Sequence, residues 1–344
     1  MSVKESYRDH VEALVKELGF HAKEPVSIKA LHARIQEHDT EIKKVLEHAY
    51  AGRIPETILS DSDFQSAFVM NLQKMVQFER TRKNDSPYYF HPIEASQELS
   101  MHPPEDEEAL KIGMIGALLH DYLEEGDLVS RASLKEFREI FPSLSEEDQE
   151  GLVMQTEPNY VENGKVENPH LDVYIDYDVL KEQTGLDRKQ LEPILFLMMT
   201  RANRVSQIVV PVDKLANVGD CDIVQRKKVQ KEVSDQNSPE YKNKLLAHLV
   251  KTLGTYALYA DGCILPDAQK SKSALIAAIE EKVNVLSSEF PYLSEEVKKA
   301  TKVFRQRFQD PKIRTTLSSQ LVPYLQGIGL IDMAKKILAE SAIK

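Results

Sequence analysis

The stretch Gly116–Glu125, GALLHDYLEE, places a histidine and three carboxylates directly after an apolar run. Apolar side chains recur at helical spacing there and predict a buried helix, at Ile112, Ile115, Leu118 and Leu119. His120 and Asp121 follow at the carboxyl end of this helix. Residues three and four apart share a helix face, so Glu124 and Glu125 are expected beside them. Charges next to a hydrophobic run are costly unless compensated, and a divalent metal ion is the simplest compensation.

The composition indicates a soluble, folded protein. The chain has 344 residues, of which 42% are hydrophobic and 29% charged, as in ordinary globular domains. Its purely apolar runs, such as Ile194–Met199, are far shorter than the roughly 20 residues of a membrane-spanning helix. The N-terminus lacks the apolar segment of a secretory signal. Because the two cysteines lack CxxC spacing, a reducing compartment is favoured, and we expect a cytoplasmic protein without a membrane partner.

The formal net charge of −11 opposes non-specific attraction to nucleic acid. We therefore expect no nucleic-acid partner, and a small phosphorylated ligand needs a local group of cations or a metal ion. Arg80, Arg82 and Lys83 form the densest basic group ahead of the central stretch. A second basic run, Arg226–Lys231, is typical of a solvated helix face, with a phosphate-facing role as the alternative.

The rest of the chain predicts an all-α protein in three parts. Residues 1–60 carry the amphipathic stripes of short helices, and residues 266–344 carry those of two or three more. The motif-bearing helices fall within residues 61–265. The polar stretch 156–172 contains proline and glycine and is expected to be a loop. No stretch alternates apolar and polar residues over the length of a strand, so no sheet is expected.

Two further segments hold residues that could act with the central stretch. His91 stands directly before Pro92, which suits the first turn of a helix. Asp213 follows an apolar segment that contains Pro211. A helix that begins at this proline places Asn217 one turn after Asp213 on the same face. Each residue taken singly is more typical of a helix cap or a solvated face, so it is their order along the chain that indicates a site.

The order of His91, the pair His120–Asp121 and then Asp213 resembles that of HD-domain metal-dependent phosphohydrolases. Three strings are similar to the hydrolase domain of RelA/SpoT homologues, including the small alarmone hydrolases. They are RKNDSPYYFHPIEA at 82–95, GALLHDYLEE at 116–125 and VDKLANV at 212–218. The resemblance covers roughly residues 64–260. It implies an HD-domain helical bundle with N- and C-terminal helical extensions.

The resemblance implies a role for each matching residue. The implied metal ligands are His91, His120, Asp121 and Asp213. The residues implied to manage the hydrolytic water are Glu124 and Glu125, and those implied to bind the nucleotide are Arg82, Lys83, Lys214 and Asn217. Imidazole and carboxylate ligands together suit Mn²⁺, Fe²⁺ or Zn²⁺, and the family usually uses Mn²⁺.

Three departures from the family's pattern lie near the implied nucleotide pocket. Glu125 replaces an aspartate, Ala216 stands where a histidine is common, and Val210–Pro211 replaces a lead-in of the Lys-Leu type. None of them alters an implied metal ligand. The resemblance therefore favours metal binding and phosphohydrolase chemistry more strongly than one particular substrate.

Three functions remain open as expectations. The first is a Mn²⁺-dependent 3′-pyrophosphohydrolase of guanosine-3′,5′-bis(diphosphate), ppGpp. The second is the same chemistry on another nucleotide, such as a nucleoside phosphate or the 2′-phosphate of NADPH. The third is a non-catalytic nucleotide-sensing module. The terminal helical extensions are expected to serve packing or to form a homo-oligomer.

Overall fold

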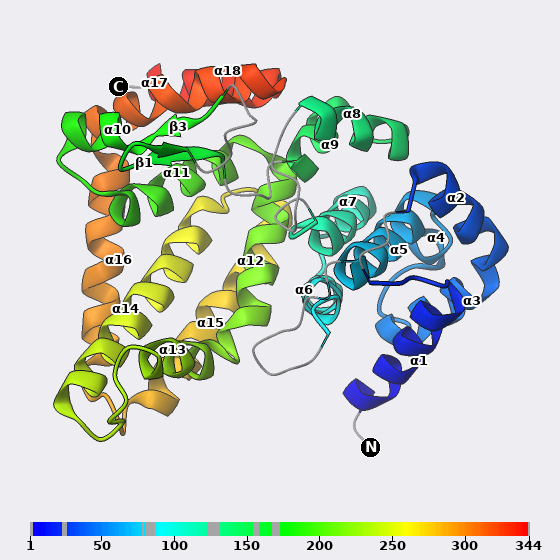
Figure 1. Cartoon of the computed structure of the whole chain (residues 1–344), viewed down its shortest axis with the longest axis horizontal. Coiled ribbons are helices and arrows are strands. Elements are labelled where there is room, and N and C mark those ends of the chain that lie inside the picture. The colour runs from blue at the N-terminus through cyan, green and yellow to red at the C-terminus, as the bar shows by residue number, and fades with distance from the viewer. Residues whose placement is uncertain are drawn as a thin grey trace. The chain divides into compact units, whose positions relative to one another are not determined.

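The computed structural model describes residues 3–22, 26–77, 79, 87–122, 131–153, 158–166 and 173–342. These residues form eighteen α-helices, one 3-10 helix and three short strands (Figure 1). The predicted all-α class and helical-bundle architecture are thereby confirmed. The chain divides into two compact units, unit 1 (Met1–Glu157) and unit 2 (Pro158–Lys344). The predicted parts 1–60, 61–265 and 266–344 stay predictions.

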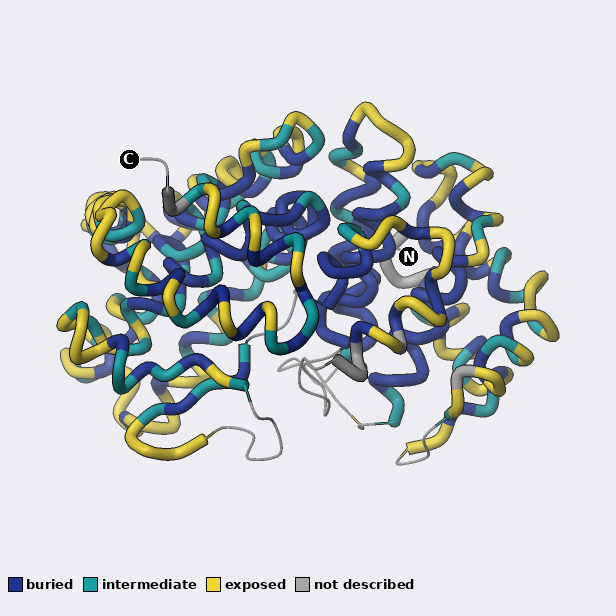
Figure 2. The backbone as a smooth tube through the Cα atoms, turned by 90° about the horizontal axis from the view of Figure 1, so that it is seen from above, coloured by how far each residue is buried: buried dark blue, intermediate teal, exposed yellow. Residues whose placement is uncertain are grey.

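Nine α-helices make up most of the described residues of unit 1. Its helices are α1 (Val3–Glu17), α2 (Ile28–Glu37), α3 (Asp39–Tyr50), α4 (Glu56–Leu59), α5 (Ser62–Gln77), α6 (Phe90–Met101), α7 (Glu107–Leu119), α8 (Arg131–Ile140) and α9 (Glu146–Val153). Helix α7 packs against both α5 and α6. Because every residue from Asp63 to Met75 is buried, α5 runs through the core of this unit. The outer helices instead alternate buried and exposed residues (Figure 2).

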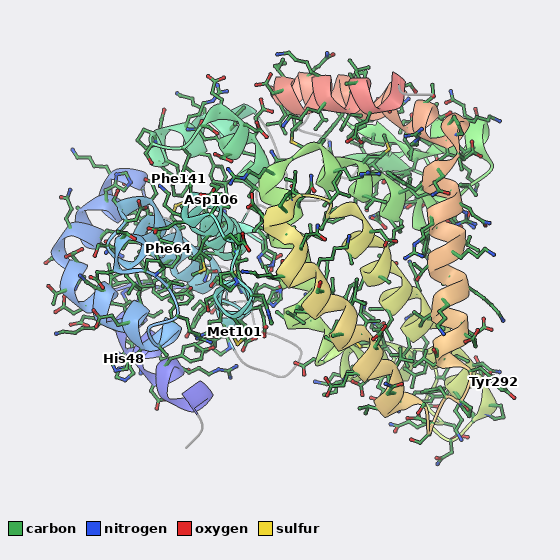
Figure 3. All side chains as sticks on the ribbon, turned by 180° about the vertical axis from the view of Figure 1, so that it is seen from behind. His48, Phe64, Met101, Asp106, Phe141 and Tyr292 are labelled. Carbon is green, nitrogen blue, oxygen red and sulfur yellow. The ribbon has the colours of Figure 1, made fainter. Side chains whose placement is uncertain are left out.

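Aromatic side chains fill part of the unit 1 core. Phe64 and Phe141 are both fully buried (Figure 3). Phe137 of α8 stacks on Phe141, with ring centroids 5.8 Å apart. Burial of such large apolar side chains supplies much of the free energy that holds a helical unit together.

Helix α7 carries the apolar half of GALLHDYLEE, and its two ends follow from the sequence. Asp106 caps its start, because the Asp106 side chain accepts a hydrogen bond from the Ala109 N–H at 3.1 Å. Glu107 and Glu108 in the first turn interact favourably with the positive end of the helix dipole. The helix ends at Leu119. His120 and Asp121 therefore lie at its carboxyl end, as predicted.

One long helix, α14, is the main packing partner of the other helices in unit 2. Its elements are β1 (Tyr160–Glu162), β2 (Lys165–Val166), β3 (Ile175–Asp176), α10 (Tyr177–Thr184), α11 (Arg188–Ala202), α12 (Arg204–Val218), α13 (Cys221–Gln230), α14 (Pro239–Gly262), the 3-10 helix η1 (Pro266–Ala268), α15 (Gln269–Leu286), α16 (Leu293–Gln309), α17 (Pro311–Ile328) and α18 (Ile331–Ala342). Five helices pack on α14, namely α11, α12, α13, α15 and α16. Residues 266–344 thus hold four α-helices in their described part, one more than the upper end of the prediction.

The prediction of a loop at 156–172 is wrong in part, because the described residues of this stretch include a hairpin. Strand β1 pairs antiparallel with β2 and parallel with β3. Asn163 and Gly164 form the turn with φ of 54° and 69°, the left-handed pair that a tight hairpin turn requires. The Asp178 carboxylate accepts hydrogen bonds from both of their N–H groups, at 2.9 and 2.8 Å. The Asn-Gly pair was the signal for this turn, while the strands are too short to show alternation.

Helix α12, which carries Asp213, begins at Arg204 and not at Pro211 as expected. Asn203 caps it, since its side chain accepts a hydrogen bond from the Ser206 N–H at 3.2 Å. Pro211 therefore lies inside the helix, where it removes one backbone hydrogen bond. The carboxamide oxygen of Gln207 accepts from the N–H groups after α14, Ile264 at 2.9 Å and Leu265 at 3.0 Å. These bonds hold α12 against the end of α14.

No helix in the described ranges combines the length and apolarity that crossing a membrane requires.

Candidate metal centre

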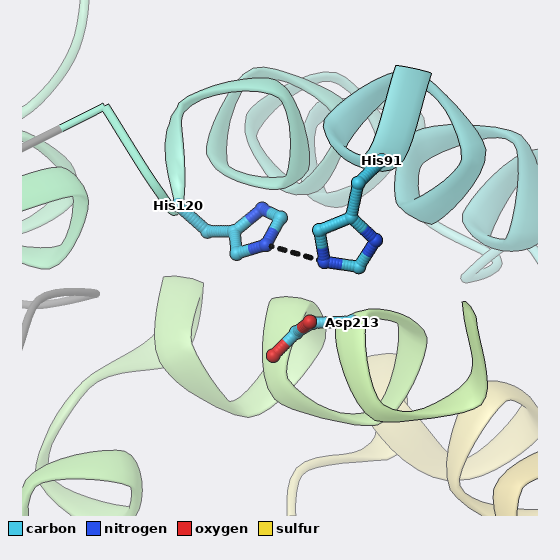
Figure 4. A group of neighbouring side chains, drawn as sticks. All are labelled: His91, His120 and Asp213. Atoms are coloured by element: carbon cyan, nitrogen blue, oxygen red, sulfur yellow. Dashed lines mark hydrogen bonds between the residues drawn. The ribbon is translucent and has the colours of Figure 1, made fainter. Parts of the chain in front are cut away.

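Three side chains of unit 1 gather where α6 begins and α7 ends. His91 lies in the first turn of α6, and His120 directly follows α7. Their Nε2 atoms are 3.3 Å apart (Figure 4). The Asp121 Oδ2 atom lies 3.2 Å from His120 Nε2 and 3.9 Å from His91 Nε2. All three residues are buried, so two imidazoles and a carboxylate converge away from solvent.

Two of the three distances among these atoms match those between ligands of one metal ion. With metal–ligand bonds of about 2.1 Å and angles of about 90–110°, neighbouring ligand atoms are roughly 3.0–3.4 Å apart. Two of the three distances, 3.3 and 3.2 Å, fall within this range, and the third is 3.9 Å. Nitrogen and carboxylate oxygen donors together suit a divalent transition metal. The residues present therefore fit such an ion.

A backbone hydrogen bond fixes the orientation of the His120 ring. His120 Nδ1 lies 2.7 Å from the carbonyl oxygen of Ala117. A carbonyl only accepts, so Nδ1 carries the hydrogen and the neutral ring keeps its lone pair on Nε2. Ala117 belongs to the last turn of α7, where carbonyl groups lack partners within the helix. The end of α7 thus fixes both the tautomer and the direction of the imidazole.

Asp213 of unit 2 has a different environment. The Asn217 carboxamide donates to Asp213 Oδ1 at 2.8 Å and to the Asp213 carbonyl at 3.0 Å. This confirms the predicted placement of Asn217 one turn after Asp213. The Lys214 ammonium pairs with Asp213 Oδ2. Each oxygen of this carboxylate is therefore held by a group from its own helix.

Lys214 remains a cation in this setting. Burial acts to lower the pKa of its ammonium group, but the Asp213 carboxylate opposes this effect and the net shift is upward. The rings of Phe196 and Tyr259 also lie near the ammonium, with centroids 5.8 and 5.9 Å from Nζ. The pair of Asp213 and Lys214 is consequently close to neutral as a whole.

The described residues provide part of the predicted site. His91, His120 and Asp213 are buried, and each offers an imidazole nitrogen or a carboxylate oxygen that could hold a metal ion. Asp121 offers a further carboxylate. Four predicted site residues lie outside the described residues, namely Arg82, Lys83, Glu124 and Glu125. Their assigned roles stay predictions.

The basic run of α13 has the solvated character that its sequence favoured. Lys227, Lys228 and Lys231 are exposed. The Arg226 guanidinium donates to Glu289 Oε1 at 3.1 Å, and its Nε lies 3.9 Å from Asp222 Oδ2. Carboxylates of unit 2 therefore already compensate the most enclosed cation of this run.

Two buried polar residues of α5, which precedes the ligand-bearing segments in the chain, belong to none of the sequence motifs. Asn71 and Lys74 are buried, with 0% and 4% of their surface exposed. They stand three residues apart in the apolar segment FVMNLQKMV, and hence on one helix face. A polar pair at this spacing in so apolar a helix is the signal that could have identified them.

No protein-family model, curated protein or solved structure matches the chain. Membership of the HD-domain phosphohydrolases therefore stays a prediction from the three strings quoted above.

Proposed function

We propose that the chain is a divalent-metal-dependent phosphohydrolase of a phosphorylated nucleotide, with ppGpp as substrate and pyrophosphate leaving from its 3′ position. One observation carries the proposal. Two imidazole nitrogens and one carboxylate oxygen of unit 1 lie within 3.9 Å of one another in a buried position. The choice of nucleotide is supported by the sequence strings at 82–95, 116–125 and 212–218.

The metal ion of this proposal is Mn²⁺. His91, His120 and Asp121 would hold it from unit 1, and Asp213 would contribute the fourth ligand. When bound, a divalent ion acts as a Lewis acid that polarises a phosphoryl oxygen and makes water more acidic. The Ala117 carbonyl supports this role, because it keeps the lone pair of His120 on Nε2.

The remaining residues handle protons and charge. Glu124 and Glu125 would orient the attacking water and accept its proton. Arg82 and Lys83 would offset the negative charge of the phosphate oxygens. Lys214 supplies a further cation beside Asp213. Asn217 would act on the nucleotide side of the site, as the resemblance implies.

A nucleotide panel tests the proposal. The purified full-length chain is supplied with Mn²⁺ and incubated with ppGpp, nucleoside phosphates and NADPH, and released pyrophosphate and orthophosphate are measured separately. Pyrophosphate from ppGpp is the expected product. Orthophosphate from another nucleotide would move the proposal to that substrate. Binding without turnover of any nucleotide would make the chain a nucleotide-sensing module and contradict the enzymatic proposal.

The role of Glu124 can be tested in the same assay. Glu124→Gln keeps the size of the side chain but cannot accept a proton, so the rate should fall ~10²–10⁴-fold. Mn²⁺ binding should persist, because Glu124 is not among the implied ligands. An unchanged rate would remove Glu124 from the proposed chemistry.

A further inference from the structure

Helix α5 contacts both segments that carry the unit 1 ligands. Asn71 reaches the turn before His91, while Lys74, one turn later, reaches the residue after Asp121. We infer that Asn71 and Lys74 are positioning residues: they contact residues next to the ligands and thereby hold these two segments in place. The inference rests on the proposed metal site, and it concerns residues to which neither the sequence motifs nor the resemblance gives a role.

The Asn71 carboxamide tethers the entry to α6. Its Nδ2 atom donates to the Tyr89 carbonyl at 3.0 Å. The main chain there turns through two short-range bonds, from Phe90 N–H to the Pro87 carbonyl at 3.3 Å and from His91 N–H to the Tyr88 carbonyl at 2.9 Å. Pro92 has no N–H to add an ordinary helical bond to this turn. The tether from α5 therefore restrains the backbone that aims the His91 imidazole.

The burial of Asn71 supports this role. The residue is completely buried, and its Oδ1 atom has no hydrogen-bond partner among the described residues. An unpaired polar atom in a core costs free energy that an apolar residue of similar size would avoid. The bond to Tyr89 offsets part of that cost and provides the reason for a carboxamide at this position.

Lys74 restrains the segment on the other side of the ligand group. Its ammonium lies 4.8 Å from the centroid of the Tyr122 ring, and both residues are buried. A cation over an aromatic face is attracted most strongly when it is removed from water. Tyr122 directly follows Asp121, and its N–H donates to the Leu119 carbonyl at 2.9 Å. Holding the Tyr122 ring thus limits the freedom of the turn that presents His120 and Asp121.

The test compares Asn71→Leu with Gln73→Leu in the full-length chain. Gln73 is buried on the same helix, but its side chain donates to Gln77 at 2.9 Å and not to a ligand-bearing segment. Asn71→Leu should weaken Mn²⁺ binding by about tenfold or more, as loss of groups behind metal ligands usually does. Gln73→Leu should leave the affinity unchanged. Lys74→Met should weaken it and Lys74→Arg should restore it, because a guanidinium also binds an aromatic face.

A second readout separates this inference from the proposed function. Nitrogen NMR signals of the two imidazoles are recorded in the metal-free chain. Asn71→Leu should shift or broaden the signals of His91, whereas Gln73→Leu should leave them in place. Equal behaviour of Asn71→Leu and Gln73→Leu in both readouts would overturn the inference. Failure of the wild-type chain to bind Mn²⁺ would instead overturn the proposed function, and the metal-free signals of His91 would still decide the role of Asn71.

Discussion

Asp121 of unit 1 and Asp213 of unit 2 are both buried carboxylates at the predicted site, but their neighbours differ. Asp121 faces the Nε2 atoms of two histidines, 3.2 and 3.9 Å away. Asp213 is paired with the ammonium of Lys214. Buried charge requires compensation, and unit 2 supplies a permanent cation where unit 1 supplies imidazoles that can act as ligands. Under the proposed function, unit 1 would provide most of the affinity for the metal ion, and Asp213 would have to weaken its ion pair with Lys214 to act as a ligand.

The largest expected effect comes from removing the two carboxylates separately. Asp121→Asn should lower Mn²⁺ affinity beyond the ~10–100-fold typical of residues behind the ligands. Asp213→Asn should lower Mn²⁺ affinity by a smaller factor, because the wild-type carboxylate gives up part of its interaction with Lys214 when it binds metal. Calorimetric titration of each variant with Mn²⁺ measures both effects. An equal loss for the two variants would remove the distinction between the units.

Removal of Lys214 tests the internal compensation in unit 2. Lys214→Met leaves the Asp213 carboxylate without its cation, which should lower the free energy of unfolding by about 3 kcal/mol without metal. Added Mn²⁺ should then raise the melting temperature more in the variant than in the wild type, because it replaces the missing charge. Lys228→Met, at an exposed lysine, is the matched control. The same Mn²⁺-induced rise in Lys214→Met and wild type would contradict this account.

A packing change in unit 2 tests whether the arrangement of His91 and His120 in unit 1 is independent of the packing of unit 2. A Cβ atom at Gly262 would overlap the Cδ1 atom of buried Leu197. Gly262→Ala should therefore destabilise the chain by roughly 1–3 kcal/mol. Gly219→Ala is the control, because a Cβ atom there meets nothing within 4 Å and the backbone is helical. Thermal unfolding measures both variants, and the metal-free NMR signals of His91 and His120 should be unchanged in each.

The smallest expected effect is on how much stability the chain loses at acidic pH, through a residue of unit 1 that is not a predicted ligand. Burial lowers the pKa of His102, which caps the end of α6. Its stabilising contribution is therefore present above the unfolded pKa of about 6.5 and is lost as pH falls through the lower, folded value. His102→Gln should lose slightly less stability than wild type between pH 7.5 and 5. Denaturant unfolding with a chelator present measures the difference, and identical slopes would contradict the assignment.

The sequence predicted structure well where residues close together in the chain determine it. The apolar run that ends in His120–Asp121 is a buried helix with these residues at its end, because burial and the Asp106 cap agree. Leu275, Ile279 and Val283, which recur at helical spacing within the predicted C-terminal helices, are likewise buried in α15. Asn217 also meets Asp213 as the helical spacing requires.

The sequence predicted poorly where long-range contacts decide. Pro211 indicated a helix start, but α12 begins at Arg204 and Gln207 of its first turns bonds to Ile264 and Leu265, so Pro211 lies inside the helix. Asn163–Gly164 forms a hairpin whose turn depends on Asp178, far along the chain. The contact of Asn71 with Tyr89 likewise joins two helices. Spacing along one helix cannot reveal such partners.

Metal content is the most direct test of His91, His120 and Asp121 as metal ligands. The wild-type chain and His120→Ala are loaded with Mn²⁺, freed of excess metal by gel filtration, and analysed by mass spectrometry for bound Mn²⁺ per chain. Circular dichroism establishes that both are folded. We expect one tightly bound Mn²⁺ in the wild type and none in His120→Ala. A folded wild-type chain without metal, or a His120→Ala variant that retains it, would contradict the account.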